Sequence, residues 1–281
     1  MEFDNEDIGL RITRRRRSAD FIMQEDHFHS FYELFYLVSG RCRVFLNHTI
    51  YHMEPGGMIL IEPLALHHTI YGLVQESERI AVSFQTRYMD RMEAQTGGVR
   101  RTGLSANPFC AVEPGRRAYV ENLFQKISAE AQNRDEFTDM LRQNYLFELL
   151  AFCGRSGRES RQPHLEDVTE AAAQETAIQE AARYIFHHFR EPLTLELVAD
   201  RVHMTPSYFS RRFKKLTGFG YKEYLNYVRL KEASRMLLET DLPVMDVAQL
   251  CGFADGNYFG DVFKKEKGIS PRLYRKNPQI L

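Results

Sequence analysis

The chain has 281 residues, of which 43% are hydrophobic and 27% are charged, with 10 prolines and 17 glycines. This length suits two domains, and the composition excludes a disordered, collagen-like or coiled-coil chain. No stretch approaches 18 consecutive apolar residues, and the N-terminal segment carries acidic residues first and no apolar run. We therefore expect no membrane span and no secretory signal, and we predict a soluble cytoplasmic protein.

Charge is distributed unevenly along the chain. Residues 180–281 hold 17 Lys and Arg against 12 Asp and Glu, a net charge of +5, which leaves −6 for the rest. A basic C-terminal third behind an acidic body suggests a nucleic-acid partner. By itself this imbalance is also explained by a solvated helix face.

The four cysteines are scattered and contain no CxxC pair. This spacing favours reduced thiols in the cytosol over a disulfide framework or a zinc site. The positions are Cys42, Cys110, Cys153 and Cys251.

The first ninety residues are patterned as strands. Runs rich in aromatic and β-branched residues, broken by Gly, Pro and Asn, predict strands over 31–40, 41–47, 56–63 and 79–85, which is typical of a sandwich or barrel. From about residue 114 the apolar period changes to three and four, which predicts two amphipathic helices. These helices either cap the barrel or form a dimer contact.

Four consecutive arginines, Arg14–Arg17, raise the question of nucleic-acid binding near the N-terminus. In a strand, alternate side chains point to opposite sides, so at most half of them could reach DNA. We predict a solvated arm here. Further along, the polar segment 154–174 contains Gly, Ser and Pro and predicts a linker between a domain over 1–153 and a domain over 175–281.

An internal repeat is the most informative feature of the C-terminal third. Tyr208-Phe209, Phe213-Lys214-Lys215 and Gly218 recur 50 residues later, and Val198-Ala199 recurs 49 residues later, so one residue has been gained in the second turn. Each copy has capping residues and apolar periods that predict two helices joined by a tight turn, a helix-turn-helix unit. The predicted units cover about 194–217 and 243–267, and a helix over 221–240 joins them.

The second helix of copy one has two different faces. Phe209, Phe213 and Leu216 fall at i, i+4 and i+7 and are predicted to face the core. Short hydroxyl donors and cations lie away from that stripe, as entry into the major groove requires. These outward residues are Ser207, Ser210, Arg211 and Lys214.

With these motifs, residues 178–276 resemble the DNA-binding domain of the AraC/XylS family of bacterial transcription regulators. The resemblance implies two helix-turn-helix units that bind promoter DNA, with base reading by Ser207, Ser210 and Arg211. In copy two it implies reading by Asn257 and by the positions of Gly256, Gly260 and Asp261. A glycine has no side chain to read with and an aspartate repels phosphate, which favours a positioning role for copy two. The remaining cations are either phosphate contacts or solvated charges: Arg212, Lys214, Lys215, Lys264 and Lys265.

In the N-terminal domain, His27, His29, Glu33 and Gly40 form the pattern HxHx3Ex6G, and His67 follows in a later predicted strand. Alternation places His27, His29 and Glu33 on one face of a strand. The pattern resembles the two-motif signature of cupin barrels, which in metal-dependent members holds iron, manganese or zinc. Three readings stay open: a metal site, a metal-free pocket for a small polar ligand such as a sugar, and a structural role. We favour the metal-free pocket. His68 leaves open which of the two adjacent histidines faces inward.

The sequence therefore predicts an α+β chain of two domains, a cupin-like β-barrel with flanking helices and an all-α domain with two helix-turn-helix units. We expect a ligand-responsive, sequence-specific transcriptional regulator rather than an enzyme. Family resemblance implies activation of carbohydrate-use genes, contact with RNA polymerase and a homodimer. The alternative is a metal-dependent cupin enzyme fused to a DNA-binding domain.

Overall fold

The structure is a computed structural model of the chain, and it describes residues 3–7, 9–17, 29–71, 76–96, 107–132, 135–156 and 170–276. The chain divides into two compact units, Met1–Glu166 and Asp167–Leu281. In the described ranges no helix is long and apolar enough to cross a membrane. All four cysteines lie in the described ranges, where they are buried and form no disulfide.

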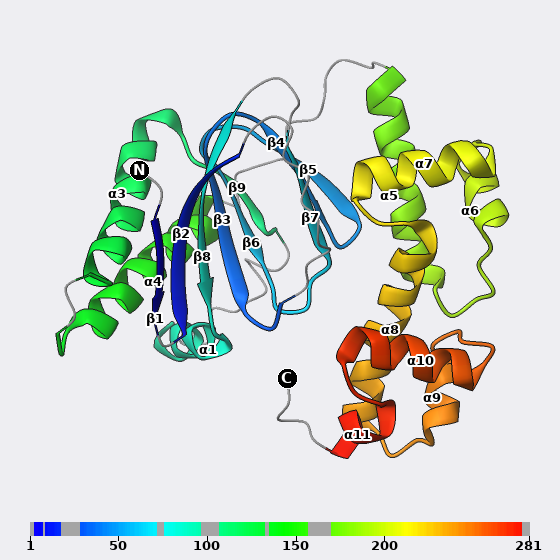
Figure 1. Cartoon of the computed structure of the whole chain (residues 1–281). Coiled ribbons are helices and arrows are strands. Elements are labelled where there is room, and N and C mark those ends of the chain that lie inside the picture. Colours follow the sequence, from blue (N-terminus) through cyan, green and yellow to red (C-terminus); the bar gives the residue numbers. More distant parts are fainter. Residues whose placement is uncertain are drawn as a thin grey trace. The chain divides into compact units, whose positions relative to one another are not determined.

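The N-terminal unit is built on two antiparallel sheets (Figure 1). The larger sheet has six strands in the order β1-β2-β8-β3-β6-β9, and the smaller has three in the order β5-β4-β7. The strands are β1 (Phe3–Asp7), β2 (Leu10–Arg17), β3 (Tyr32–Ser39), β4 (Cys42–Leu46), β5 (Thr49–Met53), β6 (Gly57–Ile61), β7 (His67–Tyr71), β8 (Ser77–Phe84) and β9 (Phe109–Ala111). The four predicted strands correspond to β3, β4, β6 and β8, and β7 contains the later strand expected for His67; β1, β2, β5 and β9 were not predicted.

Both faces of the larger sheet are covered. On one face, alternate residues such as Leu34 and Tyr36 pack against the helices α1 (Thr86–Gln95), α3 (Pro114–Glu130) and α4 (Thr138–Ser156). Their neighbours Phe35 and Leu37 point the other way, into a core shared with the smaller sheet. Because β3 is buried on both faces, its sequence reads as a nearly continuous apolar run. The helices α3 and α4 are those that the apolar period predicts.

The position of the arginine run differs from our expectation. Arg14–Arg17 is not a solvated arm, because it forms the second half of β2 and pairs in register with β8. Arg14 Nε donates to Glu78 Oε1 at 3.0 Å, and Arg16 Nε lies 3.5 Å from the same oxygen. A run of like charges is accommodated in a strand because alternation sends neighbouring side chains to opposite faces, where an anion can meet them.

The C-terminal unit is entirely helical, as predicted. Two helix-turn-helix units, α6–α7 and α9–α10, pack along α8, with α5 against the first and α11 against the second (Figure 1). The helices are α5 (Glu170–His188), α6 (Leu195–Arg201), α7 (Pro206–Thr217), α8 (Tyr221–Glu239), α9 (Val244–Leu250), α10 (Gly256–Lys267) and α11 (Pro271–Lys276). Residues 157–169, within the predicted linker, lie outside the described residues.

Candidate nucleic-acid interface and ligand site

The two recognition helices share one architecture. Phe209 and Phe213 of α7 and Phe259 and Phe263 of α10 are almost completely buried, which confirms the predicted inward face. Each helix ends at a left-handed glycine, Gly218 with φ +87° and Gly268 with φ +74°, as helix C-termini favour. The repeat in the sequence is therefore a repeat in structure.

The two helices begin differently. Asp255 caps α10, because its carboxylate accepts the backbone N–H groups of Asn257 at 2.6 Å and Tyr258 at 3.1 Å. Thr205 lies at the corresponding position of α7, but its side chain makes no capping hydrogen bond, and Pro206 starts the helix instead. Thr194 caps α6, where the N–H of Leu197 donates to Thr194 Oγ1 at 3.2 Å.

The outward face of α7 carries the predicted reading residues. Ser207 and Arg211 are exposed and Ser210 is half-buried, and their spacing of three to four residues puts them along one face. Arg212 is half-buried, whereas Lys214 and Lys215 in the last turn are exposed. The helix has four cations and no acidic residue. This face can offer hydroxyl and guanidinium donors to base edges and positive charge to phosphates.

The matching face of α10 has fewer side chains that can donate hydrogen bonds. Asn257 is exposed, Gly260 replaces Ser210, and the exposed Asp261 replaces Arg211. A Cβ atom built on Gly260 would meet nothing within 4 Å, so nothing in the fold of this unit requires a glycine there. Lys264 and Lys265 are exposed like their counterparts in α7. The structure thus repeats the exposed lysine pair in copy two without a counterpart of Arg211.

The second candidate site lies between the two sheets of the N-terminal unit. It brings together His29, Glu33 and His67, three of the four predicted residues; the fourth, His27, lies outside the described residues. Glu33 projects from β3 on the same side as Phe35, and His67 begins β7. The His29 and His67 ring centroids are 4.9 Å apart, and His29 Nε2 lies 3.6 Å from Glu33 Oε2. His67 is therefore the histidine of the pair 67–68 that joins this cluster.

Both imidazoles are oriented by the backbone. His29 Nδ1 is 2.7 Å from the carbonyl oxygen of Phe31, and His67 Nδ1 is 2.9 Å from that of Ala65. Since a carbonyl can only accept, each Nδ1 carries a proton. Nε2 is an acceptor in the neutral ring, and in the cationic ring it is a donor that can face the Glu33 carboxylate. The Nε2 atoms are therefore the groups that a ligand would meet.

Sequence reasoning missed one member of the cluster, Arg79 of β8. Its Nη1 lies 3.8 Å from Glu33 Oε1, its guanidinium lies 5.5 Å from the Phe35 ring centroid, and its side chain is only 17% exposed. Its Nε is buried without a hydrogen-bond partner. A single arginine at the start of an apolar strand gives no signal of this kind, because one sequence does not show that both faces of that strand are covered.

Charge in the cluster is set by Glu33. Burial raises the pKa of the Glu33 carboxyl, but the contact with His29 and the charges of Arg79 and His67 outweigh it and hold the pKa at about 2. The carboxylate is therefore ionised at neutral pH. Nearby, burial raises the pKa of Tyr71 to about 12, so its hydroxyl stays neutral. The site combines a carboxylate acceptor, a guanidinium donor and two imidazoles.

A metal ion would need at least three suitable donors. Within the described ranges, no group of three His, Cys, Asp or Glu side chains is placed to hold one. His29, Glu33 and His67 therefore do not by themselves form a metal centre in this structure. The same donor and acceptor set suits the hydroxyl groups of a polar organic molecule.

Comparison with known proteins assigns both units. An AraC-like ligand binding domain model matches residues 11–150, and a helix-turn-helix domain model matches residues 198–277. The HTH-type transcriptional regulator YisR of Bacillus subtilis is 28% identical over 263 residues, which cover 88% of this chain and 86% of that protein. The HTH-type transcriptional activator RhaS of Mannheimia succiniciproducens is 24% identical over 277 residues, which cover 97% of this chain and 96% of that protein.

A third relative resembles the DNA-binding unit more closely. The HTH-type transcriptional regulator YijO of Escherichia coli is 41% identical over 108 residues, which make up 38% of this chain and 38% of that protein. Together these matches confirm the predicted family and the two-domain fold class. The chain belongs to the AraC family of DNA-binding transcriptional regulators, with an AraC-like ligand-binding domain followed by a double helix-turn-helix domain.

Proposed function

We propose that this protein is a ligand-responsive activator that binds a specific promoter sequence when a small polar molecule, of the sugar class, occupies the cluster between the two sheets. The observation that carries the proposal is the buried set of His29, Glu33, His67 and Arg79 inside the ligand-binding domain. Activation is supported by the likeness to the transcriptional activator RhaS along nearly the whole chain. That the regulated genes serve carbohydrate use follows from the sugar class of the proposed ligand. The protein would act in the cytoplasm, where promoter DNA and RNA polymerase are its partners.

The chemistry of the cluster favours a polyhydroxyl ligand. Glu33 and the two Nε2 atoms accept hydrogen bonds, whereas Arg79 donates them, so adjacent hydroxyl groups can be satisfied in both directions. Buried polar groups that lose their partner cost about 1–3 kcal/mol each, which makes such a site selective for the ligand that matches it. The relatives named above are regulators, and the proposal includes no chemical conversion of the ligand.

The response requires that the ligand bind two arrangements of the protein with different affinity. By linkage, promoter DNA then changes the affinity for the ligand by the same factor. We propose that Ser207, Ser210 and Arg211 read bases in one major groove, while Asn257, Lys264 and Lys265 hold the next one, about one helical turn or roughly 34 Å away. Arg212, Lys214 and Lys215 would contact the phosphates beside the first groove.

We also propose a homodimer in which α3 and α4 form the contact. Three large apolar side chains of this region are about half exposed: Tyr119 at 49%, Phe137 at 53% and Met140 at 52%. A dimer would bring two DNA-binding units to paired promoter sites. The double variant Phe137→Glu with Met140→Glu is expected to be monomeric in analytical ultracentrifugation, and a dimer that survives both changes would refute this contact.

The ligand proposal is tested by thermal unfolding with a panel of monosaccharides, on the wild-type chain and on Glu33→Gln. We expect at least one sugar to raise the unfolding midpoint of the wild type by several degrees and to change its DNA affinity, because a ligand that binds only the folded state stabilises it. Glu33→Gln keeps the side-chain shape but removes the carboxylate, so neither effect should remain. A sugar that stabilises both proteins equally would place the binding site elsewhere.

A further inference from the structure

Besides α8, the segment between α5 and α6, which leads into the first helix-turn-helix unit, contacts the second unit. The turn after α5, residues Phe189–Glu191, packs against the turn between α9 and α10. Gly252 of that turn has φ +86°, and a Cβ atom on it would lie 2.6 Å from the Phe189 carbonyl oxygen and 3.0 Å from Arg190 Cα. The backbone that leads into the first unit therefore lies directly against the backbone of the second unit.

Copy one shows that the turn itself does not need a glycine. Its left-handed residue, 49 positions earlier, is the exposed His203 with φ +55°. The backbone bonds match: Met204 N–H donates to the Ala199 oxygen at 2.9 Å, and Phe253 N–H to the Ala248 oxygen at 3.0 Å. A side chain is accommodated in one turn and excluded from the other, and the difference is the contact with Phe189 and Arg190.

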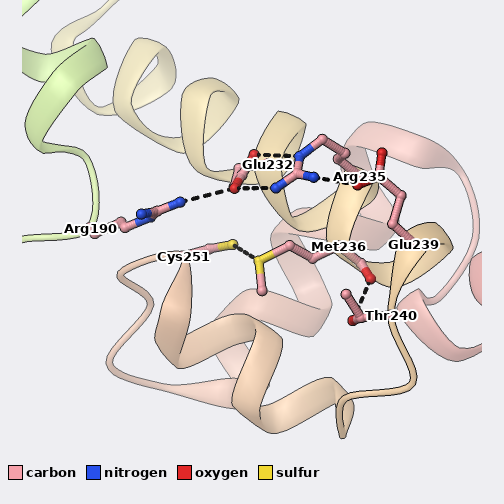
Figure 2. A network of polar contacts seen from close by, with 7 residues as sticks. All are labelled: Arg190, Glu232, Arg235, Met236, Glu239, Thr240 and Cys251. Carbon is pink, nitrogen blue, oxygen red and sulfur yellow. Dashed lines mark hydrogen bonds and ion pairs between the residues drawn. The ribbon is translucent and has the colours of Figure 1, made fainter.

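Two residues of α8 bind the turn 189–191. Arg229 donates from Nε to the Phe189 oxygen at 2.8 Å and from Nη2 to the Glu191 oxygen at 2.9 Å, and its guanidinium lies 5.7 Å from the Phe253 ring centroid. Glu232 accepts from Arg190 Nη2 at 3.0 Å (Figure 2). Arg229, Glu232, Gly252 and the turn 189–191 together are called the clamp below.

We propose that the clamp fixes the angle between the two recognition helices, with Arg229 as its main positioning residue, so that both can enter successive major grooves of one duplex. This inference rests on the proposed contact of both units with DNA. A single helix such as α8 can bend. A bend of about 10° over the roughly 34 Å between grooves would move one recognition helix by about 6 Å, half the groove's width of about 12 Å.

Hydroxyl-radical footprinting of the full chain on one selected genomic site tests the clamp. On the wild type we expect two protected patches on one face of the duplex, about one turn apart. Arg229→Met removes both donors to the turn and keeps an unbranched side chain. We expect the Arg229→Met protein to retain the patch protected by copy one and to lose at least half of the protection at the patch of copy two. Its affinity for the site should fall about tenfold.

The control is Arg235→Met. Arg235 also pairs with Glu232, at 2.9 Å, and with Glu239, but all three residues belong to α8 (Figure 2). Arg235→Met makes the same substitution at another arginine of α8 and removes its ion pairs without removing a donor to the turn, so both patches should remain. A folded Arg229→Met protein with both patches and unchanged affinity would overturn the clamp, whereas a single patch on the wild type would instead refute DNA contact by both units.

A second pair of variants covers the case in which Arg229→Met does not fold. Gly252→Ala places a methyl group against the Phe189 carbonyl oxygen and is expected to weaken the second patch selectively. His203→Ala has a similar left-handed backbone but an exposed side chain, so it should keep both patches. Equal footprints from these two variants would contradict the role of the close approach at Gly252.

Discussion

Copy one and copy two of the helix-turn-helix repeat share their buried residues but differ in the residues that face outward. The buried phenylalanines and the terminal glycines recur at an offset of 50, and the left-handed turn residues at 49. The charged residues of the two helices differ: α7 has four cations and no acid, whereas α10 has three lysines together with Asp261 and Glu266. The fold constrains the buried and turn positions in both copies, whereas the charged positions differ. This difference supports the proposed division of function, with base reading by copy one and positioning by copy two.

The largest expected effect is that of Arg211→Ala. If Arg211 contacts a base edge, specific DNA binding should weaken by about 1–3 kcal/mol, or roughly fivefold to more than a hundredfold. Asp261→Ala at the matching position of copy two should cause no such loss. Fluorescence anisotropy on the selected site and on random DNA measures both variants. An equal loss of Arg211→Ala affinity on random DNA would show that the residue meets only phosphate.

The next largest effect is expected at the N-caps of α10 and α7, whose removal should change the free energy of unfolding by different amounts. Asp255→Ala removes two capping hydrogen bonds from α10 and is expected to lower the free energy of unfolding by about 1 kcal/mol. Thr205→Ala removes no capping bond from α7, so its effect should be much smaller. Urea unfolding monitored by circular dichroism compares them. Equal losses would mean that Asp255 does not cap α10 in solution.

Gly260→Ala is expected to stabilise the protein by roughly 0.5–1 kcal/mol, because alanine favours the helix and the added methyl meets no neighbour. Gly256→Ala is the comparison, since its Cβ would lie 2.5 Å from the Met245 side chain and should bring no such gain. Urea unfolding measures the stability of both. DNA affinity should stay within about twofold for Gly260→Ala. A large loss of affinity despite higher stability would show that DNA approaches the α10 backbone closely.

The smallest expected effect is that of Asp261→Asn. Removing a negative charge near phosphates should raise the affinity for random DNA by about twofold to fivefold, and less at high salt. A salt titration of binding measures this directly. A decrease in specific affinity would instead indicate that Asp261 accepts from a cytosine amine, which would make copy two a base reader.

Much of the C-terminal unit could be predicted, because its repeat shows the same pattern twice. The positions of Phe209, Phe213 and Gly218 follow from helical periodicity and capping, which are local properties. The clamp could not be predicted, because Gly252 and Phe189 meet only through the packing of two helix pairs. In the sequence, a glycine required by a close backbone contact cannot be distinguished from an ordinary turn glycine.

In the N-terminal unit the histidine pattern identified part of the cluster, but the expected strand alternation was wrong for His29. This residue lies before β3, which begins at Tyr32, and its ring lies near Glu33 from that preceding segment. Arg79 contacts Glu33 from β8, the neighbouring strand of the same sheet, and no spacing in the sequence links the two residues. The arginine run was assigned to a solvated arm for a similar reason. Only the pairing of β2 with β8, and the position of Glu78 on the latter, makes a strand of four arginines stable.

The most direct test of the division between the two copies is selection of DNA from the genome of the source organism by the purified chain at physiological salt, followed by sequencing. The account predicts an enriched site with two short segments about 10 base pairs apart. The first should have the sharper base preference and lose it with Arg211→Ala. Binding without any enriched sequence, or a sharper segment that Arg211→Ala leaves unchanged, would contradict it.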